Sequence, residues 1–188
     1  MAKLVKQIYG DALFELALEE NRLDAFAQEI QILDQALSEN PELTKVMSHP
    51  KITKEEKVEL IEGILKGRIQ DELTGLIRLM VEKEHYPDLF DLFSYFLEKV
   101  KEHKNIGTAY VTSARELTEE QKAAVKNRLL ETTSYVEFEM HYAVDEALIG
   151  GMKVRIGDRV ADSSIATKLS NLTRELTKIQ LKVGEGNP

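Results

Sequence analysis

The hydrophobic pattern of this 188-residue chain changes its period once, near Asn105. Before that point apolar residues recur every three or four positions, for example between Leu23 and Leu37, and this spacing forms one face of an α-helix. After it, residues 136–144 alternate between apolar and polar side chains, which is typical of a half-buried strand. The chain therefore predicts two domains: an all-α six-helix bundle at residues 1–104 and a small α+β domain at residues 105–188.

Prolines and capping residues divide the first half into helical segments. Thr53 and Glu56 have the spacing of a capping box, and Gly67 is placed to end the helix that they begin. Asn40 precedes Pro41, which indicates an N-cap followed by proline at the first helical position. Short connections between six such helices predict an antiparallel bundle. The expected helices cover approximately residues 3–20, 23–37, 41–48, 54–66, 69–85 and 88–104.

The second half predicts the element order β-α-β-β-β-α. Thr118 and Gln121 form a second capping box at the start of its first helix. Gly150-Gly151 and Gly157-Asp158 are interpreted as turns around two short strands. The expected strands cover residues 106–113, 136–144, 152–156 and 159–162. Ser163 or Ser164 is expected to cap the last helix. This helix carries an apolar seam of Ile165, Leu169, Leu172, Leu176 and Ile179.

Composition and charge exclude several classes of protein. The chain contains no cysteine. This excludes disulfide scaffolds, zinc ribbons, iron–sulfur clusters and thiol nucleophiles. The net charge is −8, so neither nucleic acid nor an anionic lipid surface is an expected partner. No apolar run approaches the roughly 18 residues of a membrane-spanning helix. The first segment mixes charges with apolar residues, and we expect a helix there rather than a signal peptide.

The residues that could carry chemistry do not form a recognisable catalytic pattern. The chain has 33 Asp and Glu residues, but most lie in pairs on predicted solvent faces, where no burial raises their pKa. The four histidines form no metal-binding pair, and strands rather than helices follow the glycine turns, unlike a phosphate-binding loop. We expect no active site, cofactor or metal. A small hydrolase that uses carboxylates is the least favoured alternative.

Two predicted helices carry more apolar surface than a bundle requires. The first helix has an apolar arc of about 180°, whereas one contact face needs roughly 100°. In the segment 69–85, Leu79 lies to one side of the main apolar seam. Two explanations of this extra apolar surface are possible. Both helices are central in the bundle and contact several neighbours, or they form a groove that binds an amphipathic helix of another protein. These two interpretations remain open at this point.

Three segments of the chain resemble a known family. They are IYGDALFELALEENRLDAFAQEI, LIRLMVEKEHYPDL and DEALIGGMKVRIGDRVADSSIATKL. They are similar to the delta subunit of bacterial F-type ATP synthases, which is related to the mitochondrial oligomycin-sensitivity-conferring protein. The most specific part of the resemblance contains Asp145, Gly150, Gly151, Gly157 and Asp158, which we expect to form structural turns.

The resemblance implies a stator subunit of a rotary, proton-translocating ATP synthase, without an active site of its own. It implies that the first and fifth helices bind the N-terminal helix of an alpha subunit, and that the second domain binds the b subunits of the peripheral stalk. It also implies a peripheral position at the cytoplasmic face of a bacterial cell membrane, without direct membrane insertion. A generic two-domain helix-binding adaptor is the alternative. The alpha-facing residues implied are Tyr9, Ala12, Leu13, Leu76 and Leu79.

Overall fold

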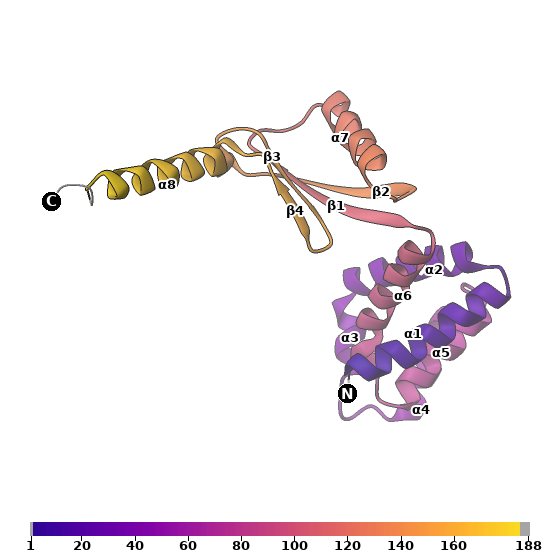
Figure 1. Ribbon diagram of the computed structural model, residues 1–188. Helices are drawn as coiled ribbons and strands as arrows, with labels where there is room; N and C mark the ends of the chain where they lie inside the picture. Colours follow the sequence, from indigo (N-terminus) through magenta and orange to yellow (C-terminus); the bar gives the residue numbers. More distant parts are fainter. Residues whose placement is uncertain (1, 185–188) are drawn as a thin grey trace. The chain divides into compact units, whose positions relative to one another are not determined.

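The computed structural model of the chain describes residues 2–184, with side chains for residues 4–176. It contains two compact units, Met1–His103 and Lys104–Pro188. The first is helical, and the second combines a sheet with two α-helices (Figure 1). The expectation of a helical unit followed by a small α+β unit is therefore confirmed.

The N-terminal unit is built around α6, which packs against both α1 and α2, while α4 packs against α5. Its core contains large apolar side chains from all six α-helices, including the fully buried Phe26, Phe93 and Phe96. The helices are α1 (Ala2–Glu19), α2 (Leu23–Glu39), α3 (Pro41–Met47), α4 (Lys54–Leu65), α5 (Asp71–Glu82) and α6 (Leu89–His103), with the 3₁₀ helix η1 (Tyr86–Asp88) before α6.

Gly10 allows α1 to approach α6 closely. A Cβ atom at this position would lie 2.5 Å from Cδ1 of Tyr95 on α6, so a larger residue would push the helices apart. Beside it on the interface, the Tyr95 hydroxyl donates a hydrogen bond of 2.8 Å to Oδ1 of Asp11. Lys99 forms an ion pair with the same carboxylate. These contacts fix α1 against the helix at the centre of the unit.

The local signals for helix ends are borne out in most places. Thr53 and Glu56 form the predicted capping box, and Gly67 has a φ of +74° just beyond α4. Asn40 occupies the predicted N-cap position of α3, with proline following at the start of the helix. Its side-chain amide, however, donates to the carbonyl of Ala36 at 2.7 Å and makes no capping bond to α3. The predicted position of the cap is therefore confirmed, but its side chain bonds the end of the preceding helix instead of α3.

The helix predicted over residues 69–85 is shorter in the structure, where α5 ends at Glu82. Glu84 has a φ of +62°, the amide of His85 donates to the carbonyl of Met80 at 2.8 Å, and the amide of Glu84 donates to the carbonyl of Val81 at 3.0 Å. This pair of bonds is a Schellman motif, which usually uses glycine at the position of positive φ. Because a glutamate stands there, no local signal marked the helix end.

The C-terminal unit contains one four-stranded sheet with the order β2-β1-β3-β4. β1 and β2 are parallel and joined through α7, whereas β3 is antiparallel to both β1 and β4. The helix α7 lies over β1 and β2 (Figure 1). The elements are β1 (Ile106–Ser113), α7 (Glu119–Thr132), β2 (Glu137–Val144), the 3₁₀ helix η2 (Glu146–Leu148), β3 (Met152–Ile156), β4 (Arg159–Asp162) and α8 (Ile165–Gly184).

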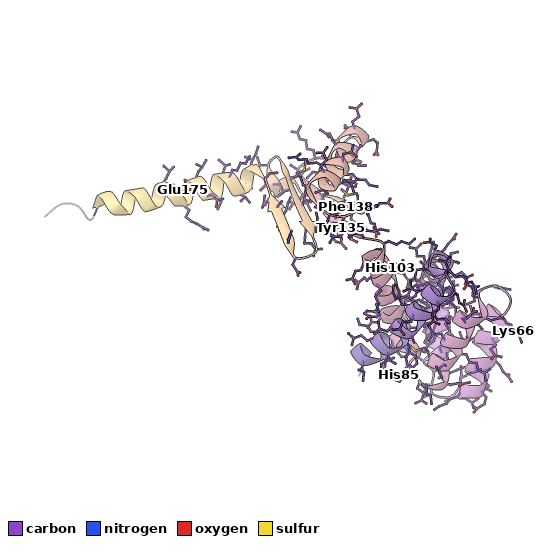
Figure 2. The ribbon with its side chains drawn as sticks, turned by 45° about the vertical axis from the view of Figure 1, so that its right-hand side comes forward. Lys66, His85, His103, Tyr135, Phe138 and Glu175 are labelled. Carbon is purple, nitrogen blue, oxygen red and sulfur yellow. The ribbon has the colours of Figure 1, made fainter. Side chains whose placement is uncertain are left out.

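Only a small core lies between α7 and the sheet. Ala109, Val111 and Phe138 are its buried apolar residues. Figure 2 shows Tyr135 next to Phe138 at this core, and their rings meet edge to face with centroids 5.2 Å apart. The capping box of Thr118 begins α7 as predicted. No residue of α7 is fully buried, so this helix covers the sheet loosely.

Candidate helix-binding surfaces

The outward face of α1 is apolar although it faces solvent. Leu4 and Ile8 are 62% and 56% exposed, and Ala12 continues this face one turn further along the helix. Val5 and Leu16 beside them are half-buried. Since the core is already contacted by the opposite side of α1, this second apolar face has no partner among the described residues. The wide apolar arc of the sequence is thus a real surface feature.

A smaller apolar surface lies on α5. Leu79 is 36% exposed, and Leu76 is half-buried at the edge of the core. Gly75 stands next to them, and a Cβ atom there would meet nothing within 4 Å. Arg22, which follows α1, donates to Glu72 in the first turn of α5 at 3.4 Å, so the end of α1 lies near the start of α5.

The five residues that the resemblance implied for alpha binding occupy different environments. Ala12 and Leu79 are exposed, and Tyr9 and Leu76 are half-buried. Leu13 is only 4% exposed and belongs to the core of the bundle. Its contact with a partner stays a prediction, and in this conformation its side chain supports the surface from below.

Charged residues surround the apolar surface of α5. Arg78 pairs with Glu82 at 2.8 Å and with Glu62 at 2.8 Å, and its side chain is 52% exposed. These two carboxylates raise the pKa of the Arg78 guanidinium. Exposed pairs of this kind contribute little to stability. They form a polar rim, which is typical of a binding surface with an apolar centre.

A third apolar surface lies on α8, and the sequence did not reveal that it has no partner within its own unit. The described members of its predicted seam are all exposed, and α8 runs away from the sheet (Figure 1), with Glu175 on its outer part in Figure 2. Ile179, the last predicted member, lies outside the described side chains. The exposed fractions are 43% for Ile165, 49% for Leu169, 55% for Leu172 and 64% for Leu176.

The start of α8 is fixed by hydrogen bonds. Ser164 is fully buried, and its hydroxyl accepts from the amide of Thr167 at 3.2 Å, which makes Ser164 rather than Ser163 the cap. The Asp162 carboxylate accepts from the Ser164 amide at 2.8 Å and from the Thr167 hydroxyl at 2.9 Å. The Ser164 hydroxyl, the Ser164 amide and the Thr167 hydroxyl lower the pKa of Asp162, in that order of effect. The start of α8 is thus held to the end of β4.

Three of the residues that carry the family resemblance lie at turns near the start of α8. They are Asp145, Gly150 and Gly151. Asp145 accepts from the amide of Ala147 at 3.0 Å and thereby caps η2. A Cβ atom at Gly150 would lie 2.6 Å from Ile165, and one at Gly151, where φ is +77°, would lie 2.6 Å from the carbonyl of Ser163. These glycines therefore let the chain pass close to the beginning of α8.

The other turn of that motif joins β3 and β4. Gly157 and Asp158 are its two central residues, and Gly157 has a φ of +54°. A two-residue hairpin favours glycine at the first central position when φ is positive there. Both predicted residues thus occupy a tight turn at the end of the sheet away from α8.

Metal-binding clusters and membrane-spanning helices are not found in the described part of the chain. No group of three or more His, Asp and Glu side chains among residues 4–176 is arranged to hold a metal ion. Within the described helices, none combines the length and apolarity needed to cross a membrane.

Comparisons of the sequence with a family model and with known proteins agree on one family. A family model described as the ATP synthase delta (OSCP) subunit matches residues 5–176. The chain is 53% identical over 181 residues to an ATP synthase subunit delta of Lachnoclostridium phytofermentans, covering 96% of this chain and 100% of that protein. It is 35% identical over 170 residues to an ATP synthase subunit delta of Exiguobacterium sibiricum, covering 90% and 95%.

A solved structure shares the fold. A chain in the Toxoplasma gondii mitochondrial ATP synthase hexamer superposes with a TM-score of 0.69 at 17% sequence identity, covering 92% of this chain and 97% of that chain. The family model and the sequence relatives both extend over nearly the full length. The chain therefore belongs to the ATP synthase delta (OSCP) subunit family.

Proposed function

We propose that this chain is a non-catalytic stator subunit that links the catalytic head of an F-type ATP synthase to its peripheral stalk. The N-terminal unit binds the N-terminal helix of an alpha subunit, and the C-terminal unit binds the b subunits. Through these partners the chain is held peripherally at the cytoplasmic face of a bacterial cell membrane. The observation that carries the proposal is the unpartnered apolar surface of α1, with Leu4 62% and Ile8 56% exposed.

The chemistry of this surface favours a helix as its occupant. Apolar side chains at positions 4, 8 and 12 of α1 follow one helical stripe, and an amphipathic helix presents a matching row of anchors at every third or fourth residue. Small residues at Ala12 and Gly75 leave room for a close approach of its backbone. The exposed side chain of Leu79 on α5 supplies a second wall.

A stator has a mechanical task that suits such contacts. Torque from the rotor acts on the head, so the link must dissociate slowly, and no chemical turnover is required of it. Most differences in affinity between related interfaces lie in the dissociation rate, and buried apolar area is a large part of what keeps the partners together. Two separate apolar surfaces, one in each unit, allow one chain to bind the head and the stalk together.

The test of the head-binding surface is Ala12→Asp, measured by calorimetry against a peptide of the alpha N-terminus. A carboxylate buried against the peptide without a partner would cost several kcal/mol, which corresponds to a loss of affinity of about a hundredfold or more. Leu79→Ala should weaken binding less, because it removes contact area only. In the free protein Ala12 faces water, so the melting temperature should change little.

The matched control is Ala25→Asp, an exposed alanine on α2 outside this surface, which should bind the peptide as the wild type does. If Ala12→Asp unfolds the protein, or if both variants bind equally well, the proposed surface on α1 is wrong.

The stalk-binding surface is tested by Leu172→Asp on α8, with pull-down of a purified fragment from the C-terminal end of b. Leu172 is 55% exposed, so the C-terminal unit should stay folded after the substitution. The variant should no longer bind the b fragment. Ser170→Asp places the same charge on the opposite, polar side of α8 and should leave binding within about twofold. Equal effects of the two substitutions would indicate a charge effect and would contradict docking on the seam.

A further inference from the structure

The exposed seam of α8 has the spacing of a coiled coil. Its described members, Ile165, Leu169, Leu172 and Leu176, follow one another at intervals of four, three and four residues, which is the alternation of d and a positions in a heptad repeat. Their side chains are 43–64% exposed. A narrow seam of this period fits a single neighbouring helix, whereas a helix that covers the core of a globular unit carries a wider apolar face.

Charges along one edge of the seam indicate which helix that neighbour is. Lys168 stands directly before Leu169, and Glu175 directly before Leu176, so both charges occupy g positions on the same edge of α8. Both side chains are exposed, and neither forms an ion pair with another described residue. Charges at g positions select the partner and the direction of helices in a coiled coil.

Two copies of α8 match each other when they run in opposite directions. If Leu169 lies opposite Leu172 of a second copy, then Ile165 lies opposite Leu176 of that copy, and the two-fold symmetry repeats both layers. The two seams then form four apolar layers. Because α8 contacts η2 and runs away from the sheet (Figure 1), the two sheets lie at opposite ends of such a pair and do not obstruct it.

The same antiparallel register brings opposite charges together. The g edges of the two helices adjoin, so Lys168 of each copy faces Glu175 of the other at two symmetric places. In a parallel pair, g positions adjoin e positions instead, and Lys168 would face the uncharged Thr173. The complementarity of charge therefore selects a second copy of this chain, in the antiparallel direction, as the occupant of the seam.

We propose that two copies of this chain associate through α8 as an antiparallel pair of helices, with Lys168 of each copy against Glu175 of the other. This pairing goes beyond the proposed stator function and does not depend on it. It covers the same seam that is proposed to bind the b subunits. A chain outside the ATP synthase thus keeps this apolar seam away from water until the stalk replaces the second copy.

The first test is sedimentation equilibrium of the full chain between about 1 and 500 µM. One short helix against another buries little area, so we expect a reversible dimer with a dissociation constant on the order of tens of micromolar. Leu172→Asp places a carboxylate in each of the two inner layers and should leave the chain monomeric. Ser170→Asp, on the polar side of α8, should dimerise as the wild type does. A monomeric wild type, or equal association of the two variants, would overturn the pairing.

The second test exchanges the charges at the g positions. Lys168→Glu makes both g positions acidic, and Glu175→Lys makes both basic. Each variant alone should dimerise about four- to thirtyfold more weakly than the wild type, because two attractive pairs become repulsive. An equimolar mixture should form a heterodimer about as tight as the wild-type dimer, since each Glu then faces a Lys.

Sedimentation of the separate variants and of their mixture at low ionic strength measures these effects, because ion pairs are screened least there. Both substituted side chains are exposed, so circular dichroism should show unchanged helix content. A mixture that associates no better than the separate variants would overturn the antiparallel register and the choice of a second copy as the occupant.

The b subunits are the other candidate occupant of the seam, and the two proposals fail separately. A chain that binds the b fragment but stays monomeric at every concentration would overturn the pairing and leave the stator proposal intact. A chain that dimerises with the expected response to charge exchange, but does not bind the b fragment, would support the pairing and contradict the stalk contact.

Discussion

The two units of the chain bury their apolar side chains to very different extents. The N-terminal unit has a core to which all six of its α-helices contribute. In the C-terminal unit the buried apolar residues are Ala109, Val111 and Phe138 among the described residues, while Val136, just before β2, and Val144 at its end are 74% and 55% exposed. The first unit thus has a large core of its own, and the second buries few of its apolar side chains.

This difference suits the two proposed contacts. The N-terminal unit can present a preformed surface, because α1 is held by its other face. The seam of α8 has no counterpart among the described residues of the C-terminal unit, where α8 contacts η2. A helix that contacts its own unit only at one end is best stabilised when a partner covers the rest. We expect the C-terminal unit to gain more stability from its partner than the N-terminal unit gains.

The largest expected effect comes from matched phenylalanine truncations in the two units. Phe96 is fully buried and meets the ring of Phe14 at a centroid distance of 6.2 Å, so Phe96→Ala should cost the N-terminal unit about 3–5 kcal/mol. Phe138→Ala should cost the C-terminal unit less, because half-buried Tyr135 beside it can move into the space. Amide hydrogen exchange, resolved by NMR, measures each unit separately. A larger loss for Phe138→Ala would reverse the comparison.

Glycine substitutions should give an intermediate effect. Gly10→Ala places a methyl group 2.5 Å from Tyr95, and overpacking of this kind costs about 1–3 kcal/mol. Gly63→Ala in α4 meets nothing within 4 Å and should stabilise the helix by about 0.5–1 kcal/mol. Chemical denaturation of both variants measures the difference. A stabilising Gly10→Ala would mean that α1 and α6 are not held as tightly as their packing indicates.

Much of the local structure could be predicted from the sequence because its signals are local. The capping boxes at Thr53 and Thr118 and the change of period near Asn105 depend on residues within a few positions of one another. The end of α5 could not be predicted, because Glu84 adopts a conformation that glycine normally marks. The bond from Asn40 to Ala36 was missed because asparagine can cap a helix on either side.

The candidate surfaces were only partly predictable, for a different reason. An apolar stripe has the same sequence whether it covers its own core or a partner, so the seam of α8 does not reveal by its pattern that Leu172 and Leu176 face solvent. Likewise the arc on α1 contains both Ala12 and Leu13, of which one is exposed and the other buried. The direction of the core depends on which helices become neighbours, and no local pattern contains that information.

The smallest expected effect concerns the polar contact that holds α1 on α6. The hydrogen bonds from Lys99 and Tyr95 lower the pKa of Asp11 below its usual value. A carboxylate with a lowered pKa in the folded state contributes stability above its unfolded pKa, and this contribution is lost as the pH falls through the folded value. The same contact raises the pKa of Lys99. On the alkaline side, the stability contributed by this ion pair is therefore lost only at strongly alkaline pH.

Asp11→Asn should therefore destabilise the N-terminal unit at pH 7 and do so by less at pH 3. The side chains of Asp11 and Lys99 are 44% and 29% exposed, and solvent screening at such sites limits the effect to about 1 kcal/mol or less. Urea unfolding at both pH values measures it, with Glu59→Gln, an exposed residue of α4, as the control that should not change. A deficit that is equally large at pH 3 would show that Asp11 acts through packing, and the N-terminal unit would then owe its tight helix contact to shape alone.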